Sequence, residues 1–170
     1  MRRLILFRHG KTEARSPGGD DFERQLVERG RSDAALMGRV LAEAGYAPDM
    51  VLVSPAVRAQ ETWELAKPAF SETEARLRED LYGATPEEVA AEIEAASGDT
   101  VMVVGHNPSL QELAVNLVAE HGGRYADIDR LSAAFPTAAA AVFAVDEHGR
   151  YHLEDLFRAS DHREGAELRR

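Results

Sequence analysis

Three short runs of apolar residues stand out along the chain, and each is followed closely by polar residues or glycine. The runs are Leu4–Phe7, Met50–Val53 and Val101–Val104. Because they lack the alternation of apolar and polar residues that marks a half-exposed strand, they indicate strands buried on both faces. Weaker strand patterns occupy Ala75–Leu81, Ala138–Val145 and His152–Leu156.

Segments with helical periodicity lie between these strands. The predicted helices are Leu26–Ala44, Ala56–Ala66, Pro86–Ala96 and Ser109–Glu120, and residues 10–25 are predicted to form a loop. Thr85 is a side-chain cap in front of Pro86, whereas Gly45 and Pro68 follow two of the helix ends. Strands that alternate with helices favour a parallel sheet covered on both faces. We therefore predict an α/β fold with three layers, α/β/α, and a mainly parallel central sheet.

Length and composition are those of one globular domain. The 170 residues are 44% hydrophobic and 29% charged, which is enough for a sizeable core in a single domain at 1–159. The polar residues 160–170 are predicted to form a flexible tail. The formal net charge of -10 argues against nucleic acid or an anionic membrane as a partner, since either needs a basic face. The first apolar run is too short for a signal peptide or a membrane span, so we expect a cytoplasmic protein.

Residues suited to phosphate chemistry come after each of the three apolar runs. Arg8 and His9 end the first run, Arg58 comes shortly after the second, and His106 and Asn107 follow the third. In an open α/β sheet the ligand site lies beyond the carboxyl ends of the strands. Two arginines and two histidines could therefore meet in one phosphate-sized pocket. Taken singly, each of these residues is better explained as a turn histidine or a surface arginine.

The chemistry of these side chains fits phosphoryl transfer. A neutral imidazole is a nucleophile, and a backbone carbonyl that accepts from Nδ1 of His9 would leave Nε2 free to attack phosphorus. Guanidinium groups bind phosphate oxygens in pairs and match the charge that develops in the transition state, which suits Arg8 and Arg58. His106 precedes a helix start whose exposed N–H groups favour an anion. Asn107, in the same turn, is a further candidate for substrate binding.

Three segments resemble one family in order and spacing. LILFRHGKTE resembles the Arg-His-Gly signature of the histidine phosphatase superfamily, also called the phosphoglycerate mutase-like fold. SPAVRAQET is similar to its Ser-Pro-x-x-Arg-Ala-x-x-Thr segment, and VVGHNPSL is similar to its second-histidine segment. The small size, the stretch DDFERQLVERGRSDA, and VVGHNPSLQELA followed by FPTAAAAVF most resemble the SixA-like phosphohistidine phosphatase branch. That branch usually has Ala where this chain has Gly10.

The resemblance implies a role for each matching residue. His9 would be the nucleophile, and Arg8, Arg58 and His106 would form the phosphate pocket. Arg24, in the Asp-x-x-Arg-x-Leu element of the branch, would line the pocket or stay a solvated surface residue.

A proton donor is implied by a further match. Residues 76–83 are similar to the segment Arg-Leu-x-Glu-x-x-Tyr-Gly of mutase-like members, in which the Glu is the general acid. Glu79 falls on that position, Asp80 is an adjacent backup, and a solvated carboxylate is the competing interpretation. A phosphohistidine substrate needs such an acid less, because a protonated phosphoramidate already has a good leaving group.

The chain contains no cysteine and no HExxH, EF-hand, Walker A or GxGxxG pattern, so we expect neither a metal nor a cofactor. We predict a metal-independent phosphatase with a covalent phosphohistidine intermediate. Its expected substrate is phosphohistidine on a protein, such as a phosphorelay histidine domain. Two alternatives stay open: an enzyme of the same superfamily that acts on small phosphate esters, as a phosphatase or a mutase, and a non-catalytic module that binds phosphorylated partners.

Overall fold

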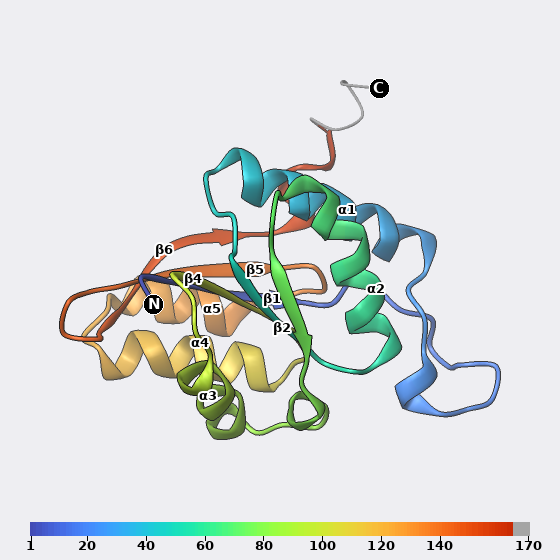
Figure 1. Cartoon of the computed structure of the whole chain (residues 1–170), viewed down its shortest axis with the longest axis horizontal. Helices are drawn as coiled ribbons and strands as arrows, with labels where there is room; N and C mark the ends of the chain where they lie inside the picture. Colours follow the sequence, from blue (N-terminus) through green and yellow to red (C-terminus); the bar gives the residue numbers. More distant parts are fainter. Residues whose placement is uncertain (165–170) are drawn as a thin grey trace.

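Figure 1 shows the computed structural model of the chain, which describes residues 1–164. Within these residues, six strands form one sheet and five α-helices cover it. The strands are β1 (Arg3–Arg8), β2 (Met50–Val53), β3 (Glu74–Leu77), β4 (Thr100–Gly105), β5 (Ala140–Val145) and β6 (Tyr151–Phe157). The helices are α1 (Glu28–Glu43), α2 (Val57–Ala66), α3 (Pro86–Ala95), α4 (Ser109–Glu120) and α5 (Tyr125–Ala133).

The sheet is mixed but mainly parallel. Its strand order is β3-β2-β4-β1-β5-β6. The first four strands of this order run parallel to one another, whereas β5 is antiparallel to β1 and to β6. Helices α1 and α2 cover one face, and α3, α4 and α5 cover the other (Figure 1). The predicted α/β fold with three layers and a mainly parallel central sheet is confirmed.

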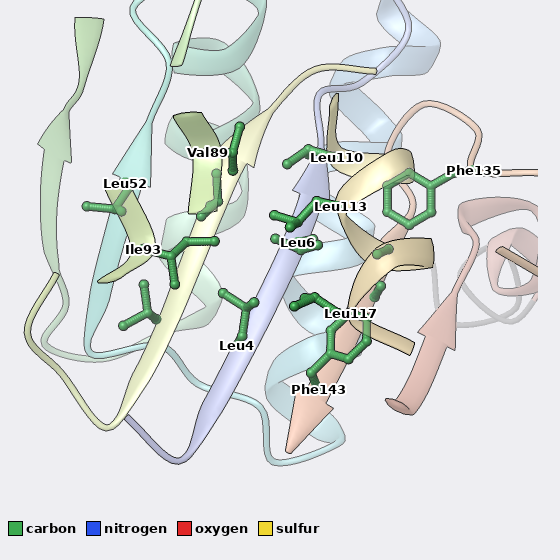
Figure 2. Close-up of a cluster of buried hydrophobic side chains, with 14 of the residues drawn as sticks. Leu4, Leu6, Leu52, Val89, Ile93, Leu110, Leu113, Leu117, Phe135 and Phe143 are labelled. Carbon is green, nitrogen blue, oxygen red and sulfur yellow. The ribbon is translucent and has the colours of Figure 1, made fainter. Parts of the chain in front are cut away.

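The burial of β1 on both faces of the sheet explains why its sequence is a continuous apolar run. Leu4 and Leu6 belong to the core under α3, α4 and α5, and Figure 2 shows them in one cluster with Leu110 and Leu113 of α4. The alternate residues of the strand, Ile5 and Phe7, belong to the core under α1 and α2. Both faces of the strand are therefore withdrawn from water, which favours apolar residues at every position.

The predicted start of α3 is confirmed in atomic detail. The side chain of Thr85 accepts from the N–H of Glu88 at 3.2 Å, and the Glu88 carboxylate accepts from the N–H of Thr85 at 2.8 Å. This reciprocal capping box satisfies two backbone donors that the helix itself leaves unpaired. Pro86 occupies the first turn, where its missing N–H costs nothing.

Two elements differ from the prediction. Strand β3 ends at Leu77, and Glu79–Leu81 form a 3₁₀ turn in place of the expected continuation to Leu81. All four residues of β3 are exposed at the sheet edge, which explains the weak pattern. Helix α5 was not predicted, because its nine residues offer a short apolar stripe around the buried Leu131.

The segment after β6 packs back onto the domain. Ala159–Asp161 form a 3₁₀ turn, and Arg163 donates to both carboxylate oxygens of the buried Asp33 on α1, at 3.0 and 2.7 Å. Residues 165–170 of the predicted tail lie outside the described residues. Each helix within residues 1–164 is too short or too polar to cross a membrane.

Candidate active site

The carboxyl ends of β1, β2 and β4 meet at one edge of the sheet. Arg8 pairs with Gly105 in the parallel register of β1 and β4. The next residue of each strand, His9 and His106, therefore leaves the sheet at the same level, and the two ring centroids are 5.3 Å apart. Ser54 follows β2 at this edge, with its Oγ 2.7 Å from Nε2 of His106. The register thus brings together two histidines that are distant in sequence.

His9 is held in the form that a nucleophile needs. Its Nδ1 lies 2.8 Å from the carbonyl oxygen of Gly10. Since a carbonyl oxygen can only accept, Nδ1 carries the proton and Nε2 keeps its lone pair. Burial is the main cause that lowers the pKa of His9 to about 3, and the charges of Arg58 and Arg8 act in the same direction. The ring is therefore neutral at pH 7.

The backbone after His9 passes very close to the start of α1. A Cβ on Gly10 would lie 2.6 Å from the carbonyl oxygen of Gly30, and a Cβ on Gly30 would lie 2.0 Å from that of Lys11. The N–H of Gly10 donates to Oγ1 of Thr62 on α2 at 3.0 Å. Glycine at position 10, where the SixA-like branch usually has Ala, thus has a local cause: this backbone contact leaves no room for a methyl group.

His106 is also buried and neutral. Burial is the main cause that lowers its pKa to about 4, the charge of Arg58 lowers it further, and the carboxylate of Asp21 opposes the shift. When the Ser54 hydroxyl donates to Nε2, the neutral ring carries its proton on Nδ1. That Nδ1 is buried and has no hydrogen-bond partner in the protein.

Two arginines complete the cluster, and each is held by only part of its guanidinium group. Arg8 donates from Nη1 to the carbonyl oxygen of Phe135 at 3.0 Å. Arg58, of which 7% is exposed, donates to the backbone oxygen of Asp21 at 2.8 Å and to Oδ2 of Asp21 at 3.1 Å. The Nε atoms of both arginines are buried without a partner. Burial lowers the pKa of Arg8, but a guanidinium stays charged in proteins.

The cluster therefore contains three buried nitrogen atoms that the protein does not satisfy. They are Nε of Arg8 and Nε of Arg58, which are donors, and Nδ1 of His106, which is a donor when Ser54 donates to Nε2. A buried donor without a partner costs about 1–3 kcal/mol, so such groups usually belong to a site that binds an acceptor. An oxyanion such as phosphate supplies several acceptor oxygens and the opposite charge. The arrangement is suited to hold a phosphoryl group within reach of His9.

A carboxylate and a tyrosine at the edge of this cluster were not predicted from the sequence. The Tyr82 hydroxyl donates to Oδ2 of Asp21 at 2.8 Å, and Arg24 donates to Oδ1 at 2.9 Å. These hydrogen bonds, that from Arg24 first, lower the pKa of Asp21 to about 2. The Tyr82 ring centroid lies 5.9 Å from that of His106 and 5.0 Å from that of Phe22.

A sequence signal for both residues existed. Asp21 is the first residue of the Asp-x-x-Arg-x-Leu element, and Tyr82 is the Tyr of the Tyr-Gly pair that follows Glu79. Neither residue could be assigned a chemical role from its motif, because the role of each depends on its hydrogen bond to the other.

Arg24 and Asn107 lie beside the four central side chains. Arg24 donates from Nε to the backbone oxygen of Glu13 at 3.0 Å and reaches Arg58 through Asp21, which both arginines contact. Asn107 donates to the carbonyl oxygen of Phe135 at 3.0 Å, the same oxygen that accepts from Arg8. A direct contact of either side chain with substrate stays a prediction.

The predicted proton donors lie in the 3₁₀ turn after β3. Glu79 and Asp80 are both exposed there, and the side chain of Glu79 makes no hydrogen bond or ion pair with any described residue. A role as general acid therefore stays a prediction. Within residues 1–164, no group of three or more His, Asp or Glu side chains is placed to hold a metal ion.

Comparison with known proteins leads to the family that the sequence motifs resemble. The family model of the histidine phosphatase superfamily (branch 1) matches residues 4–101. The uncharacterized protein Rv1276c of Mycobacterium tuberculosis is 39% identical over 143 residues, which are 83% of this chain and 88% of that protein. The crystal structure of a candidate phosphohistidine phosphatase, SixA, from Agrobacterium tumefaciens is 31% identical, with a TM-score of 0.80 over 92% of this chain and 97% of that one. A structure of the protein histidine phosphatase SixA complexed with tungstate shares the fold at 24% identity, with a TM-score of 0.76 over 94% of this chain and 98% of that one.

Proposed function

This chain belongs to the histidine phosphatase superfamily, and we propose that it is a phosphatase that removes phosphoryl groups from phosphohistidine side chains of a protein. The reaction passes through a covalent intermediate on His9. The observation that carries the proposal is the state of His9: it is buried and neutral, its Nδ1 is tied to Gly10, and its Nε2 is free beside two arginines.

The first step transfers the phosphoryl group to the enzyme. Nε2 of His9 attacks phosphorus, and the bond between phosphorus and the substrate's imidazole nitrogen breaks. The electron pair of that bond stays with the leaving nitrogen. Arg8, Arg58 and His106 donate to the phosphoryl oxygens, where negative charge is concentrated in the transition state.

The second step restores the enzyme. Water attacks the phosphoryl group on His9, the bond between phosphorus and Nε2 breaks, and its electron pair returns to Nε2. Inorganic phosphate leaves with the oxygen of the water, and the protons of the water stay on the phosphate or pass to solvent. The proton on Nδ1 stays in its hydrogen bond to the Gly10 carbonyl in both steps, so the ring returns to its starting tautomer. The four side chains supply the nucleophile and the positive charge, and the proposed reaction uses no metal or cofactor.

The exposure of the predicted proton donors favours a substrate in which the phosphoryl group is linked to nitrogen. Hydrolysis of an alkyl phosphate needs an acid close to the leaving oxygen. Glu79 and Asp80 are exposed, and the side chain of Glu79 is not held toward the cluster by any hydrogen bond. A protonated phosphohistidine has a good leaving group without such help. A phosphorelay histidine domain is a protein substrate of this kind, and we propose that the enzyme meets it in the cytoplasm.

A substrate panel tests this function. It contains a phosphohistidine peptide, an aryl phosphate, sugar phosphates and phosphoglycerates, assayed with the wild type, with His9→Ala and with His148→Ala, which removes an exposed loop histidine. We expect the wild type and His148→Ala to prefer the phosphohistidine peptide, and folded His9→Ala to turn over none of the substrates. A preference for phosphoglycerates would contradict the proposed substrate, and activity of His9→Ala would contradict the mechanism.

A further inference from the structure

Asp21 occupies a special place beside the cluster. Among residues 1–164 it is the one acidic residue whose carboxylate hydrogen-bonds to any of the four central side chains, through Oδ2 to Arg58 at 3.1 Å. Tyr82 donates to the same oxygen, and Arg24 donates to Oδ1. These three partners fix the carboxylate at the edge of the cluster, while 53% of its side chain stays exposed.

The carboxylate of Asp21 can accept more hydrogen bonds than the protein gives it. An ionised carboxylate offers about four acceptor positions, and Arg24, Arg58 and Tyr82 use three of them. One position on Oδ1 is left for a donor from outside the protein. Because the side chain is half-exposed, this position is open to solvent and to a donor that a ligand brings.

The charge of Asp21 is unfavourable for phosphate itself. Hydrogen bonds from Arg24 and Tyr82 hold its pKa near 2, so the group is anionic whenever the enzyme is folded near neutral pH. A negative charge next to an anion site repels a phosphate dianion and weakens its binding. The repulsion is offset only for a substrate that brings a hydrogen-bond donor to the carboxylate.

We propose that Asp21 is a specificity-determining residue, whose carboxylate accepts a hydrogen bond from the ring N–H of phosphohistidine and so selects nitrogen-linked over oxygen-linked phosphate. The inference rests on the proposed function and concerns only the choice of leaving group. In a protonated phosphohistidine, one ring nitrogen carries the phosphoryl group and the other carries a hydrogen. An aryl or alkyl phosphate has no donor at the corresponding place.

Aromatic rings beside Asp21 suit the same leaving group. The rings of Phe22 and Tyr82 meet edge to face, at an interplanar angle of 84°. The Tyr82 ring continues this surface toward His106, and 37% of Tyr82 is exposed. A flat imidazole can pack against such a surface while its N–H points to the carboxylate.

The proposed contact also removes the need for a general acid. When the phosphoryl group moves to His9, the electron pair of the broken bond goes to the leaving ring nitrogen. The hydrogen on the other ring nitrogen stays in place, still donated to Asp21, and the imidazole leaves as a neutral ring. Asp21 therefore neither gives nor takes a proton, in keeping with its low pKa.

The test compares two substrates in matched variants. Asp21→Asn keeps the size of the side chain and one acceptor oxygen but removes the charge. Glu23→Gln removes one charge from the same 3₁₀ turn, from an exposed side chain without a contact to the cluster. We expect Asp21→Asn to lower kcat/KM for a phosphohistidine peptide about 10- to 100-fold more than for p-nitrophenyl phosphate, the effect of one hydrogen bond to a charged group. Glu23→Gln should leave the ratio of the two kcat/KM values unchanged.

A pH profile separates this contact from a purely structural role. The wild-type preference for the phosphohistidine peptide should grow as the pH falls through the pKa of the substrate's ring, because only the protonated ring donates to Asp21. Asp21→Asn should show a smaller rise over the same range, because ring protonation still improves the leaving group but no longer adds the hydrogen bond to a carboxylate. A rise of equal size in the wild type and in Asp21→Asn would overturn the proposal.

Tyr82→Phe provides a second, milder variant. It keeps the ring but removes one hydrogen bond to Asp21, so the preference for phosphohistidine should fall in the same direction by a smaller factor.

Equal losses on both substrates in Asp21→Asn would mean that Asp21 only holds Arg58, and an unchanged ratio in Tyr82→Phe would also count against the proposal. A wild type that hydrolyses p-nitrophenyl phosphate but not phosphohistidine would contradict the proposed substrate instead.

Discussion

Replacing His9 by Asn should remove a defined part of the protein's sensitivity to acid. In the unfolded chain His9 titrates near 6.5, whereas burial lowers its pKa in the folded protein to about 3. Below pH 6.5 the unfolded chain therefore binds a proton that the folded chain excludes. The contribution of neutral His9 to stability is complete above pH 6.5 and is lost progressively as the pH falls toward 3.

The magnitude at pH 5 follows from these values. Each pH unit of differential protonation is worth about 1.4 kcal/mol, so the interval from 6.5 to 5 costs the folded state about 2 kcal/mol for His9 alone. This figure is insensitive to the folded-state pKa, because that pKa lies well below 5. His106, with a pKa of about 4, should add a similar amount, which the His9 variant retains.

Urea unfolding at pH 8 and pH 5 measures the effect. The difference between the two unfolding free energies should be about 2 kcal/mol smaller in His9→Asn than in the wild type. Asn is the suitable replacement because its side-chain N–H can still donate to the Gly10 carbonyl. His148→Asn, at an exposed loop position, should leave the difference unchanged. If wild type and His9→Asn lose equal stability on acidification, His9 is not buried in its neutral form and the case for it as the nucleophile fails.

Three further predictions concern single residues. Arg58→Lys should lower kcat on an aryl phosphate by roughly 10²–10³-fold, because a lysine ammonium lacks the rigid guanidinium group that can bind the Asp21 carboxylate and the phosphoryl group at the same time. A loss below about fivefold would contradict this. Glu79→Gln should slow alkyl phosphates far more than aryl phosphates if Glu79 is the proton donor, and an equal loss on both would point to a structural role. Gly30→Ala should cost about 1–3 kcal/mol of unfolding free energy, because the new methyl meets the Lys11 carbonyl, whereas Gly18→Ala, which has open space around it, should stay close to the wild type in the same urea titration.

The central strands could be predicted because their signal is local. Leu4–Phe7 and Val101–Val104 have side chains in both cores, so the runs are apolar at every position. The residues that follow these strands could be placed at one sheet edge for the same reason, since parallel strands end together. The structure does bring His9 and His106 side by side there.

The remaining features depend on contacts that a single segment does not encode. Asp21 acquires its position from Arg58 and Tyr82, which are 37 and 61 positions away in the chain. Helix α5 is short, and its stability comes from packing Leu131 against the rest of the core. Strand β3 is exposed along its whole length, so its apolar pattern is too weak to mark where the strand ends.

Trapping of the phosphoenzyme decides whether His9 is the nucleophile. The wild type is mixed briefly with a labelled phosphoryl donor, quenched in base, digested and mapped by mass spectrometry. We expect a base-stable, acid-labile phosphoryl group on Nε2 of His9, and none in His9→Asn. A label on any other residue, or steady turnover by a folded His9→Asn protein, would contradict it.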